Sequence, residues 1–140
     1  MATVEQQMSA DIAPIRPGTT LVEAAQQMRI SGVGALPVLD PKSEKCAAIL
    51  TERDIVVRAL AEWREPLTML ARDVATLQPV ICSPDEDIAA VAERMREHQV
   101  QHLPVCQKGK VVGLISLADI VFGRSDQERG TLVSPPTESR

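Results

Sequence analysis

Apolar residues recur with helical spacing at two places in the chain. The first set occupies positions i, i+3, i+4 and i+7 and comprises Leu21, Ala24, Ala25 and Met28. The second set has the same spacing and comprises Ile88, Val91, Ala92 and Met95. Each set predicts an amphipathic helix that buries one stripe. Thr20 and Glu23 form a predicted capping box before the first helix, and Asp87 is the expected N-cap of the second.

Short apolar runs separated by polar turns follow each helix and predict two pairs of strands. The first pair covers residues 35–39 and 46–50, with the polar stretch DPKSEK between the two strands. The second pair covers residues 102–106 and 111–115, with QKGK between them. An extended stretch ending in proline precedes each helix, IAPIRP in the first half and PVICSP in the second. With a further helix after the last strand, the order of elements is β-α-β-β-α, written twice.

The two halves are copies of one unit, because matched residues keep a nearly constant separation. Pro37 and Pro104 lie 67 positions apart, whereas Asp54 and Asp119 lie 65 positions apart. The two missing residues fall in the polar turn between the strands, where a hairpin loop tolerates deletion. One repeat cannot bury its sheet face alone. We therefore expect an α+β (mixed α/β) fold in which the tandem β-α-β-β-α repeats pack as one pseudo-twofold domain.

The pattern also predicts the division of the chain. Repeat 1 is expected at residues 4–60, a linker at 61–70 and repeat 2 at 71–123. Pro66 in the linker marks a break before a short helix. Residues 124–140 lack periodicity and are expected to form a disordered tail.

Composition narrows the classes of function. The chain is 44% hydrophobic and 24% charged, as in ordinary globular proteins, yet its aromatic residues are Trp63 and Phe122 alone, so the core must be aliphatic. A net charge of −4 provides no basic footprint for nucleic acid, and stacking platforms for single-stranded bases are scarce. The chain begins without a signal-peptide pattern, and no apolar run is long enough to span a bilayer. We expect a cytoplasmic protein with no nucleic-acid or membrane partner.

Cysteine and histidine could carry metal or redox chemistry. Cys46, Cys82 and Cys106 show no CxxC spacing, so we expect buried small apolar residues, with a single disulfide as the alternative. His98, His102 and Cys106 are spaced four apart, which would align them for zinc only on a continuous helix. A proline-containing strand follows the helix, so the helix must end between them, and we expect no metal site.

A hydroxyl residue followed three positions later by aspartate opens the last helix of both repeats. The two phrases are Thr51-Glu52-Arg53-Asp54 and Ser116-Leu117-Ala118-Asp119. Each predicts a capping box that contributes about 1 kcal/mol and needs no ligand. The same geometry suits a nucleotide, since free N–H groups at a helix N-terminus attract phosphate and an ionised aspartate accepts hydrogen bonds from both ribose hydroxyls. Arg53 adds a charge for phosphate, and both interpretations stay open.

Taken together, the segments GVGALPV…AILTERDIV and HQVQHLPV…VVGLISLADIV resemble a tandem pair of cystathionine-β-synthase (CBS) domains, a Bateman module, over roughly residues 4–123. In layout the chain is similar to stand-alone bacterial two-CBS proteins such as hypoxic response proteins. The resemblance implies regulatory binding of AMP, ADP, ATP or a related adenosyl ligand in the cleft between the repeats, with no required cofactor. It also implies a homodimer. We expect any output to pass through an unidentified protein partner or through the protein's own oligomeric state.

The resemblance also implies roles for individual residues. Asp54 and Asp119 would hold ribose, and Thr51 and Ser116 would contact ribose or phosphate. An aliphatic base pocket near the two Pro-Val strands would be lined by Leu36, Pro37, Val38, Leu103, Pro104 and Val105. His102 either reaches a phosphate near the second site or faces solvent.

Two departures from the family pattern affect the predicted sites. The usual glycine before the Ser/Thr-x-x-Asp phrase is present as Gly113 but is Ala48 in repeat 1, where the methyl group either crowds a ligand or fills the core. Leu117 and Ala118 replace the charged pair of repeat 1, so the first site is better equipped for phosphate. No G-x-S-x-G, Walker or HExxH motif supports an enzyme. The alternative function is a dimeric scaffold whose nucleotide sites are vestigial.

Overall fold

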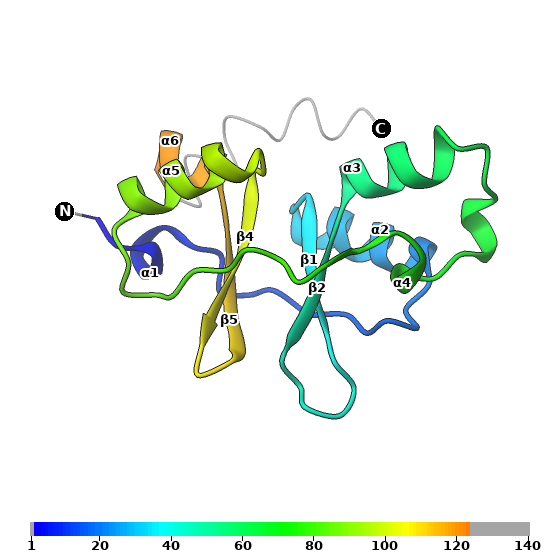
Figure 1. The fold of residues 1–140 in the computed structure, drawn as a ribbon, viewed down its shortest axis with the longest axis horizontal. Coiled ribbons are helices and arrows are strands. Elements are labelled where there is room, and N and C mark those ends of the chain that lie inside the picture. The colour runs from blue at the N-terminus through cyan, green and yellow to red at the C-terminus, as the bar shows by residue number, and fades with distance from the viewer. Residues whose placement is uncertain (1, 124–140) are drawn as a thin grey trace.

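The computed structural model of the protein describes residues 2–123. Two antiparallel hairpins stand side by side at its centre, with helices on their flanks (Figure 1). β1 (Ala35–Leu39) pairs with β2 (Cys46–Thr51), and β4 (His102–Gln107) pairs with β5 (Lys110–Ser116). Both predicted strand pairs are confirmed, with ends that differ by one residue at most. The predicted disordered tail at 124–140 lies outside the described residues.

The two stretches with helical spacing form α2 (Leu21–Ser31) and α5 (Ile88–His98), which confirms both predicted helices. At the start of α2, Oγ1 of Thr20 accepts a hydrogen bond from the backbone N–H of Glu23, and Oε1 of Glu23 accepts one from the backbone N–H of Thr20, both at 3.0 Å. Asp87 caps α5 by accepting a backbone hydrogen bond from its first turn at 3.1 Å. Each helix therefore begins where its capping residues predict.

The prediction that Ala25 belongs to the buried apolar stripe of α2 is wrong. Leu21, Ala24 and Met28 are buried, but Ala25 is exposed. Gln27 beside Met28 is half-buried, so the covered face of the helix is turned away from Ala25. The spacing alone could not show on which side of Ala24 the sheet lies.

The last helix of each repeat begins directly after its hydroxyl residue, as predicted. α3 (Glu52–Ile55) follows Thr51 and runs on into a π-helical turn, η1 (Val56–Leu60). α6 (Leu117–Phe122) follows Ser116 in repeat 2. Neither these nor any other helix within residues 2–123 combines the length and apolar character needed to cross a bilayer.

The predicted opening strand of each repeat is reduced to one bridged residue. Ile15 forms a parallel bridge with Val38, and Cys82 forms the equivalent bridge with Val105. Prolines lie close on both sides of each bridged residue, as IAPIRP and QPVICSP show. Two positions after each bridged residue the chain has a proline, Pro17 or Pro84, which has no N–H to donate, so the ladder cannot extend in that direction.

The segment before each repeat packs on the other repeat. Between the repeats, the 3₁₀ turn η2 (Pro66–Thr68) leads into α4 (Ala71–Val74) and β3 (Thr76–Leu77), and β3 pairs with β2 of repeat 1. At the N-terminus, α1 (Val4–Gln7) is followed by Ser9, which bridges to β5 of repeat 2. This exchange of segments follows the pseudo-twofold symmetry. The predicted division of the chain, with a linker at residues 61–70, does not indicate it.

The core consists of three aliphatic clusters, as the scarcity of aromatic residues predicts. The repeat 1 cluster includes Val74 of α4, the repeat 2 cluster includes Val4 of α1, and both valines are at most 2% exposed. A third cluster joins the two hairpins through Ala35, Ile49 and Leu114. The two aromatic side chains, Trp63 and Phe122, are 97% and 75% exposed.

Gly113 and Ala48 occupy equivalent places but have different neighbours. A methyl group on Gly113 would lie 2.7 Å from Sδ of Met8 and 2.8 Å from the backbone oxygen of Ser9. Ala48 is 3% exposed and packs in the core of repeat 1. The glycine therefore admits the exchanged N-terminal segment, whereas the alanine fills core.

Gly113→Ala is expected to lower the free energy of unfolding by about 1–3 kcal/mol, because overpacking forces the backbone to shift. Ser9 cannot move freely, since it exchanges two backbone hydrogen bonds with Leu114, of 2.8 and 3.0 Å. Urea denaturation measures the difference. Gly18→Ala is the matched control, because no atom lies within 4 Å of a methyl group there. Equal stability of the two variants would contradict this account of Gly113.

Candidate functional site

A cavity lies beside each of the two repeated phrases, and the larger, beside Thr51–Asp54, has a volume of about 780 Å³. That volume is within the range of about 300–1,000 Å³ found for small-molecule sites. Repeat 1 contributes Gly34, Ile49 and the phrase itself, and the remaining lining comes from Thr76 and from residues 78–80 and 98–103. The cavity therefore lies between the two repeats, as the family resemblance implies for a ligand cleft.

The smaller cavity lies beside Ser116 and Asp119 and has a volume of about 200 Å³. Ser9 of the exchanged N-terminal segment lines it together with Ala118. This volume is below the range that holds a nucleotide-sized ligand. Within residues 2–123, His102 is the one lining residue of this cavity that can carry positive charge.

Asp54 is buried at 8% exposure and held by residues from three elements. In the capping box, its Oδ2 accepts a hydrogen bond from the Thr51 N–H at 2.9 Å. Its Oδ1 lies 3.4 Å from the Thr76 hydroxyl and 3.7 Å from Nε of Arg58. Arg58 is itself anchored, since its Nη1 donates to the backbone oxygen of Val74 at 3.1 Å. These contacts fix the direction of the carboxylate within the cavity lining.

Both capping boxes form, which confirms the capping interpretation of the repeated phrase. The backbone N–H of Asp54 donates to Oγ1 of Thr51 at 3.0 Å, and that of Asp119 donates to Oγ of Ser116 at 3.0 Å. Asp119 is 2% exposed. The reciprocal bond of repeat 2, from the Ser116 N–H to Oδ2 of Asp119, is also 3.0 Å.

The expectation of free N–H groups for phosphate at these helix starts is wrong for two positions in each repeat. In each repeat the aspartate N–H already donates to the capping hydroxyl. The first N–H of each helix is also occupied: the Glu52 N–H donates to the Gly34 carbonyl and the Leu117 N–H to the Gln101 carbonyl, both at 2.9 Å. These bonds fasten each helix to the strand-leading loop of its own repeat. Positive charge in the larger cavity therefore comes from the side chain of Arg53, while His98 and His102 line the same cavity as hydrogen-bonding groups.

His102 lies where the two cavities meet. It lines both of them, together with Gly34 and Gln101. Its Nε2 is 3.4 Å from the position that a methyl group on Gly34 would occupy, and Oε1 of Glu52 is 2.9 Å from that position. The pKa of His102 is lowered, because the effect of burial outweighs the opposing effect of the nearby carboxylates of Glu52 and Asp119. A glycine at position 34 lets the two polar side chains approach the same point from different repeats.

Most residues of the expected base pocket lie in the protein core. Leu103 lines the larger cavity, but five of the six residues line neither cavity: Leu36, Pro37, Val38, Pro104 and Val105. They are buried because the Pro-Val strands run through the centre of each repeat. The apolar lining of the larger cavity is formed instead by Ile49, Pro79, Val80, Val100 and Leu103.

Sequence reasoning missed the residues that the exchanged segments bring to the cavities. Thr76 and Gln78 line the larger cavity, and Ser9 lines the smaller one. Ser9 and Thr76 lie 67 positions apart, which is the offset of the two Pro-Val strands. Extending the repeat alignment toward the N-terminus would have shown their equivalence, although it would not have shown the exchange.

The side chains of Cys46 and Cys106 interact with each other, but the cysteines and the spaced histidines do not form one shared site. Cys82 and Cys106 are buried, Cys46 is half-buried, and all three are free thiols. Burial raises the pKa of the Cys82 thiol to about 12. α5 ends at His98, and His102 and Cys106 lie on β4, so the three residues do not share one helix face. No group of three or more potential metal ligands occurs in the described part of the chain.

Comparisons with known proteins agree with this architecture. The family model described as CBS domain matches residues 3–60 and 71–125. The uncharacterized protein YlbB of Bacillus subtilis is 31% identical over 139 residues, which cover 99% of this chain and 93% of that protein. Hypoxic response protein 1 of Mycobacterium tuberculosis is 33% identical over 120 residues, which cover 86% of this chain and 83% of that protein.

Two solved structures show the same fold. The crystal structure of hypoxic response protein I with two coordinated zinc ions has a TM-score of 0.74 at 31% identity and covers 89% of this chain and 100% of that one. The hexameric CBS-CP12 protein from bloom-forming cyanobacteria has a TM-score of 0.82 at 25% identity, covering 91% and 74%. The chain belongs to the CBS domain family, whose members are in general regulatory ligand-binding modules.

Proposed function

We propose that the protein is a regulatory module that binds an adenosine-type nucleotide in the larger cavity. The observation that carries this proposal is the buried carboxylate of Asp54, held in a fixed direction in the lining of a cavity of about 780 Å³. An ionised aspartate accepts hydrogen bonds only, so it suits the two vicinal hydroxyls of a ribose. Family membership supports ligand binding in general.

The other lining residues match the remaining parts of a nucleotide. Aliphatic side chains such as Ile49, Val80 and Val100 offer apolar surface to a base. Arg53 lies on the same cavity and complements the charge of phosphate, and His98 and His102 can form hydrogen bonds to it. The smaller cavity has about a quarter of the volume and no lysine or arginine in its described lining, so we assign the nucleotide to the larger cavity.

Isothermal titration calorimetry tests the proposal with AMP, ADP, ATP, NAD and S-adenosylmethionine, each added to the purified protein. We expect saturable binding of at least one of them, with one ligand bound per chain. No heat of binding across the whole series would count against the proposal.

A dimeric scaffold is the second candidate, and one observation favours it. Both capping boxes are complete without any ligand, as the bonds of Thr51 and Ser116 to their aspartates show. Under this function the two phrases serve stability alone. A protein that dimerises but binds none of the nucleotides would support it.

We further propose that two copies associate through the helices that follow the repeated phrases. Exposed apolar residues occupy equivalent places in the two repeats: Val56 matches Val121, and Val57 matches Phe122. Their exposures are 53%, 63%, 41% and 75% respectively. α3 and α6 lie on the same upper side of the molecule in Figure 1. A surface with its own twofold symmetry is suited to a symmetric, isologous contact.

The double variant Val57→Lys/Phe122→Lys is expected to weaken association at least tenfold, because it places charges in an apolar contact. Sedimentation equilibrium measures the dissociation constant. Leu77→Lys is the matched control, since Leu77 is 72% exposed and lies on β3 instead. A dimer of unchanged strength in the double variant would exclude this surface.

A further inference from the structure

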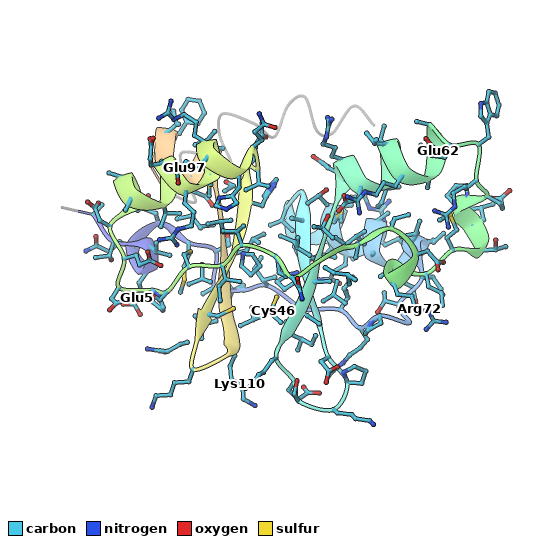
Figure 2. All side chains as sticks on the ribbon, viewed as in Figure 1. Glu5, Cys46, Glu62, Arg72, Glu97 and Lys110 are labelled. Atoms are coloured by element: carbon cyan, nitrogen blue, oxygen red, sulfur yellow. The ribbon has the colours of Figure 1, made fainter. Side chains whose placement is uncertain are left out.

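All four lysines of the chain lie in the turns of the two hairpins or directly beside them. Lys42 and Lys45 belong to the turn between β1 and β2, and Lys108 and Lys110 belong to the β4–β5 hairpin. All four are exposed. Figure 1 shows both turns at the lower edge of the molecule, and Figure 2 shows Lys110 at that edge. We call these four residues the lysine edge.

The two turns form one continuous surface. The Lys45 side chain crosses to the other turn, where its Cε lies 3.1 Å from the position of a methyl group on Gly109. Gly109 has φ +81°, a conformation that glycine adopts without strain. Arg16 lowers the pKa of the Glu44 carboxyl most, and Lys110 lies close enough to lower it further. The charges of the four lysines are therefore presented together.

The carboxylates within the turns already have other partners. Glu44 accepts hydrogen bonds from both terminal nitrogens of Arg16, at 2.6 and 3.1 Å. Asp40 accepts backbone hydrogen bonds from Lys42 at 3.0 Å and Ser43 at 2.7 Å. Within residues 2–123 no ion pair joins a lysine to a carboxylate. The ammonium groups are available to an external anion.

The remaining charge of the protein restricts which anion fits. The whole chain has a formal net charge of −4, so without its four lysines the chain has −8. A long polyanion such as duplex nucleic acid, or a broad anionic membrane, would meet this negative field beyond the edge. The turns also carry no aromatic residue for base stacking and no large apolar side chain for insertion in a bilayer. A short acidic segment would contact the positive surface alone.

We propose that the lysine edge is a docking surface for a short segment of a partner protein that is rich in aspartate and glutamate. Lysine suits such a segment, because its compact charge on a flexible stem imposes no fixed fork geometry. The surface lies at the turn ends of the hairpins, whereas the cavities lie beside the starts of α3 and α6 at the opposite strand ends. Docking there would leave the ligand cavities open.

Fluorescence anisotropy of a labelled ten-residue peptide of alternating aspartate and glutamate tests this proposal with the full chain. We expect saturable binding that weakens steeply as salt rises, because exposed charges are screened. The double variant Lys42→Gln/Lys108→Gln should weaken binding about tenfold. The matched control Arg29→Gln/Arg72→Gln removes two exposed arginines elsewhere and should leave the affinity unchanged.

Three outcomes would overturn the proposal. One is no binding of the peptide at low salt, and another is equal loss of affinity in the lysine and arginine variants. The third is binding of a 20-base-pair DNA duplex, or of vesicles containing phosphatidylserine, in place of the peptide. Circular dichroism of each variant verifies that the fold is retained, and the turns are exposed enough for glutamine to be accommodated.

Discussion

Asp54→Ala is expected to weaken nucleotide binding about 30-fold or more while the protein stays folded. Hydrogen bonds to a charged group contribute about 1.5–3 kcal/mol, and 1.4 kcal/mol corresponds to a factor of ten in affinity. The carboxylate is the acceptor that we assign to the ribose, and its removal leaves no acidic side chain in the same place. Calorimetric titration of the variant with the nucleotide that binds the natural protein measures the loss.

Loss of the cap must be separated from loss of the ligand contact. Asp54→Ala and Asp119→Ala each remove one capping box of the same kind, with bonds of 2.9–3.0 Å. Each should therefore reduce the free energy of unfolding by about 1 kcal/mol. Because Asp119 lines the smaller cavity, its variant should retain nearly full affinity. Equal affinities of both variants and the natural protein would mean that Asp54 only caps its helix.

Val74→Asp is expected to destabilise repeat 1 although residue 74 follows the linker. Val74 is 2% exposed among the repeat 1 residues of the core, and a carboxylate there would be buried without a partner. The expected loss in the free energy of unfolding is about 3 kcal/mol or more. That is a large part of the total for a typical domain, which is about 5–15 kcal/mol. Thermal unfolding measures the overall loss.

Two milder variants locate the effect in the fold. Val74→Ala removes about 1–3 kcal/mol of packing and should leave the chain folded. Amide hydrogen exchange should then quicken first within residues 35–51 of repeat 1. The reciprocal variant Val4→Ala should quicken exchange first within residues 102–116, because Val4 is buried in the core of repeat 2. If each variant affected the repeat that follows it in sequence, the exchange of segments would be wrong.

Local sequence patterns predicted the secondary structure well because local interactions determine it. Thr20 with Glu23, and Thr51 with Asp54, form caps between residues three positions apart. Such bonds need no information from distant parts of the chain, so their residue types are visible in sequence. The constant offset between the two Pro-Val strands likewise showed the repeat without any structure.

Long-range placement could not be predicted in the same way. The sequence around Val4 or Val74 does not indicate which repeat buries the side chain, because each valine lies in a short helix beside a polar stretch. The exchange depends on the direction in which the chain leaves each repeat. For the same reason Thr76 was overlooked, although it contacts Oδ1 of Asp54.

The candidate site shows the same limit. The phrase residues Thr51, Arg53 and Asp54 do line the larger cavity, as the repeat and the family resemblance implied. Leu36 and its neighbours do not, because a strand at the centre of a repeat has both faces covered. Burial of both faces cannot be read from a continuous apolar run alone.

Chemical-shift mapping tests the central claim most directly, since it reports where a ligand binds as well as whether it does. ¹⁵N-labelled protein is titrated with the nucleotide that binds in calorimetry, and with each member of the series if none does, and the backbone amide signals are followed. The account predicts saturable shifts in residues 51–54, 76, 78–80 and 98–103, within the lining of the larger cavity. Shifts confined to the smaller cavity or to the lysine edge, or no shifts at all, would contradict it.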